Sequence, residues 1–243
     1  MIDYALNSDE NEKRISIIVG HYGSGKTEFA VNYALKATKL ARYSHIALID
    51  LDIANPYFRS REKQVFLEAR GIEVLSNTFG YDINLDLPAI SARINGPLQD
   101  KSYRVIVDVG GDQTGARVLN QFRSQFKEEY ELLCLINANR TQTASITGAT
   151  DHILSIERET GLKITGLINN THLLRETTFE DILKGVSLCH DLSLILDIPV
   201  KYHCCIEKFE SDLEGYLLKN ANMNYSGKVF RIDIIMRSSW LDK

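Results

Sequence analysis

A glycine-rich stretch near the start of the chain has the residue types needed to hold a chain of phosphates. The stretch GHYGSGKT, residues 20–27, fits the pattern GxxxxGK[ST] and follows an apolar run. In this pattern backbone N–H groups converge on phosphate oxygens, and the next helix directs its positive end toward them. Lys26 is expected to reach the β and γ phosphates, and Thr27 to place its hydroxyl on Mg²⁺. The residues expected to contact nucleotide are Gly20, His21, Tyr22, Gly23, Ser24, Gly25, Lys26, Thr27 and Glu28.

Two further segments end apolar runs with aspartates that could act on a bound phosphate. In LIDLD, Asp50 and Asp52 flank one leucine, so alternation along a strand puts both carboxylates on one face. One of them could position an attacking water while the other holds Mg²⁺ or nearby backbone. In VIVDVGGD, Asp108 ends another apolar run and is expected to orient Mg²⁺ or its water shell. Gly110 and Gly111 follow it, where the backbone could respond to a γ phosphate.

The elements that must position these residues follow from the pattern of apolar runs. Such runs alternate with longer segments of helical period, which predicts βα units around a parallel sheet. RVIVDV and ELLCLINA are almost continuously apolar, as is typical of strands covered on both faces. The expected strands are 15–19, 45–50, 72–75, 104–109, 132–137, 164–169 and 199–203, and the expected helices are 25–41, 60–70, 87–95, 114–126, 143–160 and 179–192.

We therefore expect an α/β fold, a three-layer sandwich whose mostly parallel central sheet is flanked by helices, as in P-loop NTPases. The 243 residues are expected to form a single nucleotide-binding domain, with a core at about 15–207 and a C-terminal extension at 208–243. Within that extension the stretch KVFRIDIIM could add an edge strand.

Composition narrows the classes of function. A net charge of −4 argues against a dominant nucleic-acid surface, which usually needs a basic stripe. No apolar stretch has the length of a membrane span, and the first residues lack the profile of a secretion signal, so a cytoplasmic protein is expected. The four cysteines form no CxxC pair, and reduced thiols are expected. Cys189, His190, His203, Cys204 and Cys205 form two short clusters that match no zinc spacing, so buried thiols and surface histidines are the favoured interpretation and metal binding is the alternative.

From residue 15 to about 207 the chain resembles the MinD/ParA superfamily of P-loop ATPases (SIMIBI class), which includes the nitrogenase iron protein. The phosphate loop, LIDLDIANP, DVGGD and GLINNTH carry the resemblance. It implies a first switch in which Asp52 directs water, and a second in which Asp108 lies near Mg²⁺. The switch residues implied are Asp50, Gly110, Gly111 and Asp112. GLINNTH is similar to a strand that ends in a base-recognising asparagine, which implies Asn170 as first choice and Asn169 as second.

The sequence departs from this superfamily at His21. Many relatives carry a lysine there, in GKGGxGKT, which crosses a dimer to the partner's nucleotide, and Tyr22 replaces a glycine of the same pattern. The charge of a histidine varies near neutral pH, whereas that of a lysine ordinarily does not. Three assemblies therefore stay open: an ATP-sandwich dimer, a dimer of different geometry and a monomer.

The resemblance implies a Mg²⁺-dependent ATPase with slow turnover, working as a switch on a protein client in regulation or in maturation of a cofactor or metal centre. Its cofactors would be ATP and Mg²⁺, its partners ATP or ADP, the client and in one assembly a second copy. The last residues, IIMRSSWLDK, are too short and mixed for the membrane-binding helix of some relatives. One alternative is a small-molecule kinase or ATP-dependent ligase, similar to dethiobiotin synthetase or cobyrinate amidation enzymes, with an acceptor pocket near Asp82 and Asp86. Another is a binding module without turnover. The absence of a visible NKxD motif favours adenine over guanine.

Overall fold

Strands and helices alternate along the chain as the apolar pattern predicts. The computed structural model describes residues 13–40, 42–52, 63–76, 87–111, 118–126, 130–223 and 225–236, with 87–92 described for the backbone alone. Within these ranges a single sheet has the strand order β3-β2-β4-β1-β5-β6-β7-β8, and every neighbouring pair is parallel. The strands are β1 (Ile15–Gly20), β2 (His45–Asp50), β3 (Ile72–Ser76), β4 (Tyr103–Asp108), β5 (Tyr130–Ile136), β6 (Gly166–Asn169), β7 (Val200–Cys205) and β8 (Lys228–Arg231).

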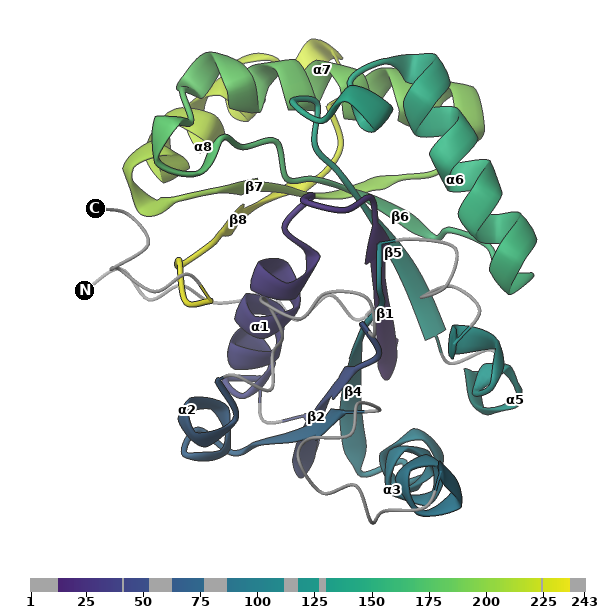
Figure 1. Cartoon of the computed structure of the whole chain (residues 1–243). Coiled ribbons are helices and arrows are strands. Elements are labelled where there is room, and N and C mark those ends of the chain that lie inside the picture. The colour runs from purple at the N-terminus through teal and green to yellow at the C-terminus, as the bar shows by residue number, and fades with distance from the viewer. Residues whose placement is uncertain are drawn as a thin grey trace.

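Helices lie on both faces of this sheet (Figure 1). Two of them, α1 (Lys26–Ala37) and α2 (Gln64–Glu68), lie on one face, and α3 (Leu87–Gln99), α5 (Arg123–Phe126) and α6 (Ile146–Thr160) lie on the other. The long helix α7 (Phe179–Leu196) packs against β6, β7 and α6, and α8 (Glu210–Lys219) packs near β8. Short 3-10 turns are η2 (Thr141–Thr143), η3 (Leu174–Glu176), η4 (Glu207–Phe209) and η5 (Ala221–Met223). The expected three-layer α/β fold is confirmed.

The central strand β1 shows why the apolar runs are continuous. All six of its residues are buried. Ile15, Ile17 and Val19 belong to the core beneath α3, α5 and α6, whereas Ile18 belongs to the core beneath α1. A strand covered on both faces has no solvent side, so nearly every position is apolar.

Several element boundaries differ from the predicted ones. The helix predicted to end at Asn95 continues as α3 to Gln99, through Pro97. The Arg14 guanidinium donates to the carbonyl oxygens of Pro97 at 3.1 Å and Leu98 at 2.6 Å, so a distant cation satisfies the end of this helix. In the C-terminal extension, for which no helix bounds were predicted from the sequence, α8 forms, and the edge strand that KVFRIDIIM could add is present as β8.

No helix in the described ranges combines the length and the apolar character needed to cross a bilayer.

Candidate functional site

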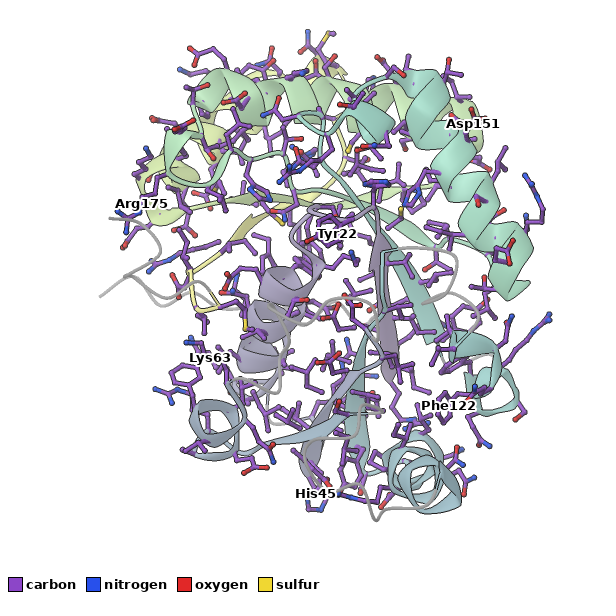
Figure 2. All side chains as sticks on the ribbon, in the orientation of Figure 1. Tyr22, His45, Lys63, Phe122, Asp151 and Arg175 are labelled. Carbon is purple, nitrogen blue, oxygen red and sulfur yellow. The ribbon has the colours of Figure 1, made fainter. Side chains whose placement is uncertain are left out.

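The phosphate loop lies between β1 and α1, at the carboxyl edge of the sheet, where Tyr22 is labelled in Figure 2. Gly25, the residue before α1, has φ +82°, a left-handed conformation that glycine adopts without strain. A Cβ atom there would collide with the Asn170 amide and lie 3.1 Å from His172 Nε2. Because Gly25 has no side chain to cap α1, the first N–H groups of this helix are available to an anion.

Lys26 and Thr27 start α1 and point toward the ends of neighbouring strands. Lys26 is 6% exposed, and its Nζ donates to the carbonyl oxygen of His21 at 3.2 Å. The Thr27 hydroxyl donates to Oδ2 of Asp108 at 2.7 Å. The two residues expected to meet phosphate and Mg²⁺ therefore lie beside the aspartate that ends β4.

Three aspartates come together at this edge. Asp50 and Asp108 are register partners across β2 and β4, and the Asp52 N–H donates to Asp50 Oδ1 at 3.0 Å. All three are buried. Burial, followed by the charge of Asp50, raises the pKa of Asp108 to about 7, although the Thr27 hydroxyl opposes the rise. Buried carboxylates so close together call for a compensating positive charge.

The donor set suits Mg²⁺. This ion takes oxygen ligands and is usually held by one or two carboxylates together with substrate phosphates and water. Oδ1 of Asp108 is buried without a hydrogen-bond partner in the described structure, next to the Thr27 hydroxyl. Thr27 and Asp108 would hold the ion, with Asp52 nearby.

The segment after β4 packs directly on the phosphate loop. A Cβ atom on Gly111 would lie 2.7 Å from the backbone nitrogen of Tyr22 and 2.8 Å from Lys26 Nζ, so a larger residue would push the two segments apart. Gly110 and Gly111 are thus placed where a change at the phosphates could reach them. The remaining predicted switch residue, Asp112, lies outside the described residues, as do Asp82 and Asp86.

The asparagines after β6 occupy different environments. Asn170 lies at the loop, where its Nδ2 donates to the carbonyl oxygen of Ser24 at 2.7 Å. Asn169 is fully buried below it, with Nδ2 donating to the carbonyl oxygen of Ile182 at 3.1 Å and Oδ1 accepting from the Thr171 N–H at 3.1 Å. Asn170 lines the cavity that extends from the phosphate loop to the end of β7, and Asn169 does not.

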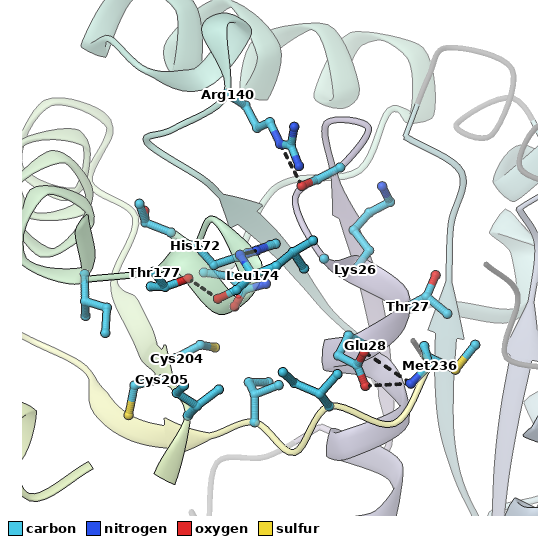
Figure 3. A pocket seen from close by; sticks show the side chains of 18 of the residues that line it. Lys26, Thr27, Glu28, Arg140, His172, Leu174, Thr177, Cys204, Cys205 and Met236 are labelled. Atoms are coloured by element: carbon cyan, nitrogen blue, oxygen red, sulfur yellow. Dashed lines mark hydrogen bonds between the residues drawn. The ribbon is translucent and has the colours of Figure 1, made fainter. Parts of the chain in front are cut away.

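Two residues at this site, Arg140 and His172, were not predicted from the sequence. Arg140 Nε donates to the carbonyl oxygen of Gly23 at 3.0 Å and brings a guanidinium to the loop (Figure 3). Burial, and next the charge of Arg140, lower the pKa of His172 to about 4, so this imidazole is neutral at pH 7. Both residues follow the carboxyl ends of strands, where open parallel sheets bind their ligands, so this position in the sequence could have identified them as candidate site residues.

A cavity of about 300 Å³ extends from the phosphate loop to the end of β7. Figure 3 shows Lys26 and Thr27 at one end and Cys204 and Cys205 at the other. The loop end is polar, with Lys26, Asp52 and Arg140, whereas the far end is largely apolar. The apolar lining comprises Leu174, Ile182, Cys204, Cys205, Ile206, Ile232, Ile234 and Met236. A polar end for phosphates and an apolar end for a flat base match the two parts of a nucleotide.

A second cavity, of about 280 Å³, lies between the start of the loop, Gly110–Gly111 and one face of α6. His21 and His152 both line it, with ring centroids 5.5 Å apart in an edge-to-face arrangement. Burial, then the charges of His21 and Lys26, lower the pKa of His152 to about 4.

The clustered cysteines are buried as expected, but the expected surface position is wrong for His203, which lies in the core, and His190 is half-buried. All four cysteines are buried free thiols. His203 Nδ1 lies 3.4 Å from Asn169 Nδ2 and its Nε2 lies 2.9 Å from the carbonyl oxygen of Ser226, so both ring nitrogens are engaged. Across the described ranges no group of three or more His, Cys, Asp or Glu side chains is arranged to hold a metal ion. A Mg²⁺ site does not require such a group, because hydroxyl, water and phosphate supply the other ligands.

Comparison with known proteins supports the fold. No protein-family model and no curated protein sequence matches the chain. Among solved structures, FtsY from Mycoplasma mycoides is similar with a TM-score of 0.54 and 17% identity, covering 79% of this chain and 59% of that chain. Chloroplast FtsY from Physcomitrella patens is similar with a TM-score of 0.51 and 17% identity, covering 77% and 56%. This chain therefore spans less than two thirds of the length of either neighbour. These similarities confirm the α/β P-loop NTPase fold expected from the sequence, while the resemblance to the MinD/ParA superfamily stays a prediction.

Proposed function

We propose that this chain is a cytoplasmic, Mg²⁺-dependent ATPase that works as a nucleotide-driven switch on a protein client. The observation that carries the proposal is the meeting of Lys26 and Thr27 with the three aspartates at the ends of β2 and β4, including the Thr27–Asp108 hydrogen bond of 2.7 Å. Phosphoryl transfer to water depends mainly on positioning and electrostatics, and this arrangement provides both.

Each residue has a task in this proposal. Lys26 neutralises the β and γ phosphates, and Thr27 and Asp108 hold Mg²⁺, which offsets the negative charge that develops on the phosphate oxygens. Asp52 lines the cavity and orients the attacking water, while Asp50 fixes the Asp52 backbone through its 3.0 Å bond. Gly111, together with the preceding Gly110, transmits the state of the γ phosphate because Gly111 packs directly against Tyr22 and Lys26 of the loop.

The far end of the cavity supports ATP rather than GTP. Guanine presents N–H donors at two adjacent positions and is best read by a carboxylate acceptor. Among the described lining residues the carboxylates are Glu28 and Asp52. Glu28 already accepts hydrogen bonds from the backbone N–H groups of Ile235 and Met236, and Asp52 lies at the phosphate end, so neither carboxylate is placed to accept the N–H groups of a guanine.

Exposed apolar side chains beside the nucleotide cavity support a protein client. Tyr22 is 64% exposed and Leu174 is 41% exposed, and both line the cavity. An exposed aromatic that sits on the phosphate loop would present a different surface when the loop holds ATP, which suits recognition by a partner.

The second cavity favours one other function, a small-molecule kinase or ATP-dependent ligase. It adjoins Gly20 and Gly111, so a bound metabolite would lie close to the phosphate loop. The two functions differ in the fate of the phosphoryl group, which water receives in one and the metabolite receives in the other.

The first experiment measures mass in solution and phosphate release together, with no nucleotide, ADP, ATP and GTP, for the natural chain and three variants. We expect slow, ATP-selective release. Lys26→Ala should lose about 10²-fold or more in turnover, and Asp52→Ala should bind ATP but hydrolyse it more slowly. Lys39→Ala, an exposed lysine just after α1, is the control and should be unchanged.

The outcomes separate the alternatives. If Lys26→Ala and Asp52→Ala both hydrolyse ATP as fast as the unsubstituted chain, the proposed ATPase site is refuted. ATP binding without any phosphate release would indicate a binding module or an enzyme that requires a metabolite, and ATP-dependent doubling of the mass would indicate a dimer despite His21.

A further inference from the structure

The segment that follows β8 is tied to α1, although the two are far apart in sequence. We call residues 232–236 the strap. The backbone of Asp233 makes a two-way pair with the Asn32 side chain, because its N–H donates to Oδ1 at 2.9 Å and its carbonyl oxygen accepts from Nδ2 at 2.9 Å. The partners are 201 residues apart in the chain.

A second tie lies one helical turn nearer the phosphate loop. Glu28 Oε1 accepts from the Ile235 N–H at 2.7 Å and from the Met236 N–H at 3.1 Å, and Figure 3 draws the bonds to Met236. Glu28 directly follows Thr27, which is expected to meet Mg²⁺. Side chains on a single face of α1 therefore hold the strap at two points.

The strap also forms part of the cavity. Ile232, Ile234 and Met236 line it, with Ile232 and Met236 buried and Ile234 47% exposed. At its start, the Ile232 N–H donates to the carbonyl oxygen of Cys205 at 2.8 Å, which joins the strap to the end of β7. The strap thus bridges α1 and β7, the two sides of the apolar end of the cavity.

We propose that the strap is the wall against which the nucleotide base packs, and that Glu28 and Asn32 are positioning residues that hold this wall in place. The proposal rests on the nucleotide binding proposed above. The strap side chains that line the cavity, Ile232, Ile234 and Met236, are apolar. The strap therefore contributes to the affinity for the base and not to the affinity for the phosphates. Docking of the strap and binding of the base are then linked, and each must strengthen the other.

Asn32 provides the cleaner test because, unlike Glu28, it does not line the cavity. The probes are ATP and inorganic tripolyphosphate, which carries the phosphates and lacks the base. Asn32→Ala should weaken ATP binding by about tenfold through the loss of two hydrogen bonds, and should leave tripolyphosphate binding unchanged. Asn120→Ala removes a bond from an exposed asparagine to the carbonyl oxygen of Glu159 and is the matched control.

The outcomes separate the strap from the nucleotide site itself. Equal loss of both probes would mean that Asn32 supports the phosphate loop or the whole fold, and would overturn the proposal. Unchanged ATP binding in Asn32→Ala would also overturn it. If neither probe binds the natural chain, the proposed function has failed and the strap proposal falls with it.

Hydrogen exchange on the natural chain tests the same idea without a substitution. ATP should slow exchange of the Asp233, Ile235 and Met236 amides, and tripolyphosphate should slow it much less. If the two probes protect these amides equally, the base does not pack on the strap.

Discussion

Arg140 binds the phosphate loop from outside it. Its Nε donates to the carbonyl oxygen of Gly23, and its guanidinium stands beside the cavity, where it can also meet phosphate. A hydrogen bond that involves a charged group is stronger than a neutral one, so Arg140→Ala should weaken ATP binding by roughly 10- to 100-fold. Arg140→Lys should recover little of this loss, since an ammonium lacks the planar donor geometry.

Calorimetric titration with ATP measures the effect of Arg140, and Arg158→Ala, at an exposed position near the end of α6, is the control. Equal affinities in the Arg140 and Arg158 variants would show that the loop keeps its shape without this contact.

Residues whose role follows from local spacing could be placed from the sequence, whereas others could not. The glycines, Lys26 and Thr27 form one short pattern, and each aspartate ends an apolar run. Arg140 meets Gly23 across 117 residues, a contact that exists because β5 lies next to β1. Asn170 was expected to read the base, and the structure places it at the site with its amide donated to Ser24, 146 residues away.

Beneath α1, a cluster of buried polar side chains links β1, β4 and β5 by hydrogen bonds. Arg104 Nη2 donates to Ser16 Oγ at 2.7 Å and lies 3.5 Å from Glu131 Oε1, while the Ser16 hydroxyl donates to the same carboxylate. Tyr33 of α1 contacts both charged groups. Removing one partner strands a buried charge, so Arg104→Met or Glu131→Leu should each cost about 3–5 kcal/mol of unfolding free energy.

The double variant tests whether this group is a coupled pair. Arg104→Met combined with Glu131→Leu should lose clearly less than the two single losses added together, because no charge is left unpaired. Urea denaturation measures the losses. ATP affinity should be unchanged, since these residues lie at the amino ends of their strands. Additive losses would rule out coupling.

Strands were easier to predict than the ends of helices. A strand buried on both faces is visible as a continuous apolar run, and β1, β4 and β5 illustrate this. Helix ends depend on partners that local sequence does not contain. The end of α3 is held by Arg14, which lies more than 80 residues earlier, and α7 continues four residues beyond its predicted end at Leu192.

At the scale of the whole molecule, three histidines contribute to the response to acid: His203 is buried, and His152 and His172 are half-buried. Burial is the main cause that lowers the pKa values of His152, His172 and His203 to about 4. An unfolded histidine titrates near 6.5, so between about pH 4 and 6.5 the unfolded chain binds more protons and stability falls as the pH falls. Asp108, with its pKa raised to about 7, acts in the opposite direction over much of this range.

With three histidines acting in one direction and Asp108 in the other, the unfolded chain binds about two more protons than the folded chain in this window. The unfolding free energy should therefore rise by roughly 2–3 kcal/mol per pH unit. Urea denaturation without Mg²⁺ at pH 5.0 and 6.5 measures the slope. His203→Gln removes one titrating group, so the difference in bound protons between the unfolded and folded chains should fall by about one, and the slope of unfolding free energy against pH should fall with it. A flat profile would show that these imidazoles become protonated without unfolding.

The ties between α1 and the strap also bear on how the protein is made. Asn32 and Glu28 leave the ribosome early, but their partners follow 201 to 208 residues later. At ordinary translation rates this interval is roughly 10 to 40 s. A nascent chain would therefore display a phosphate loop well before the wall of its base pocket exists. During synthesis it should discriminate poorly between nucleotides, and acquire selectivity only when the strap emerges and docks.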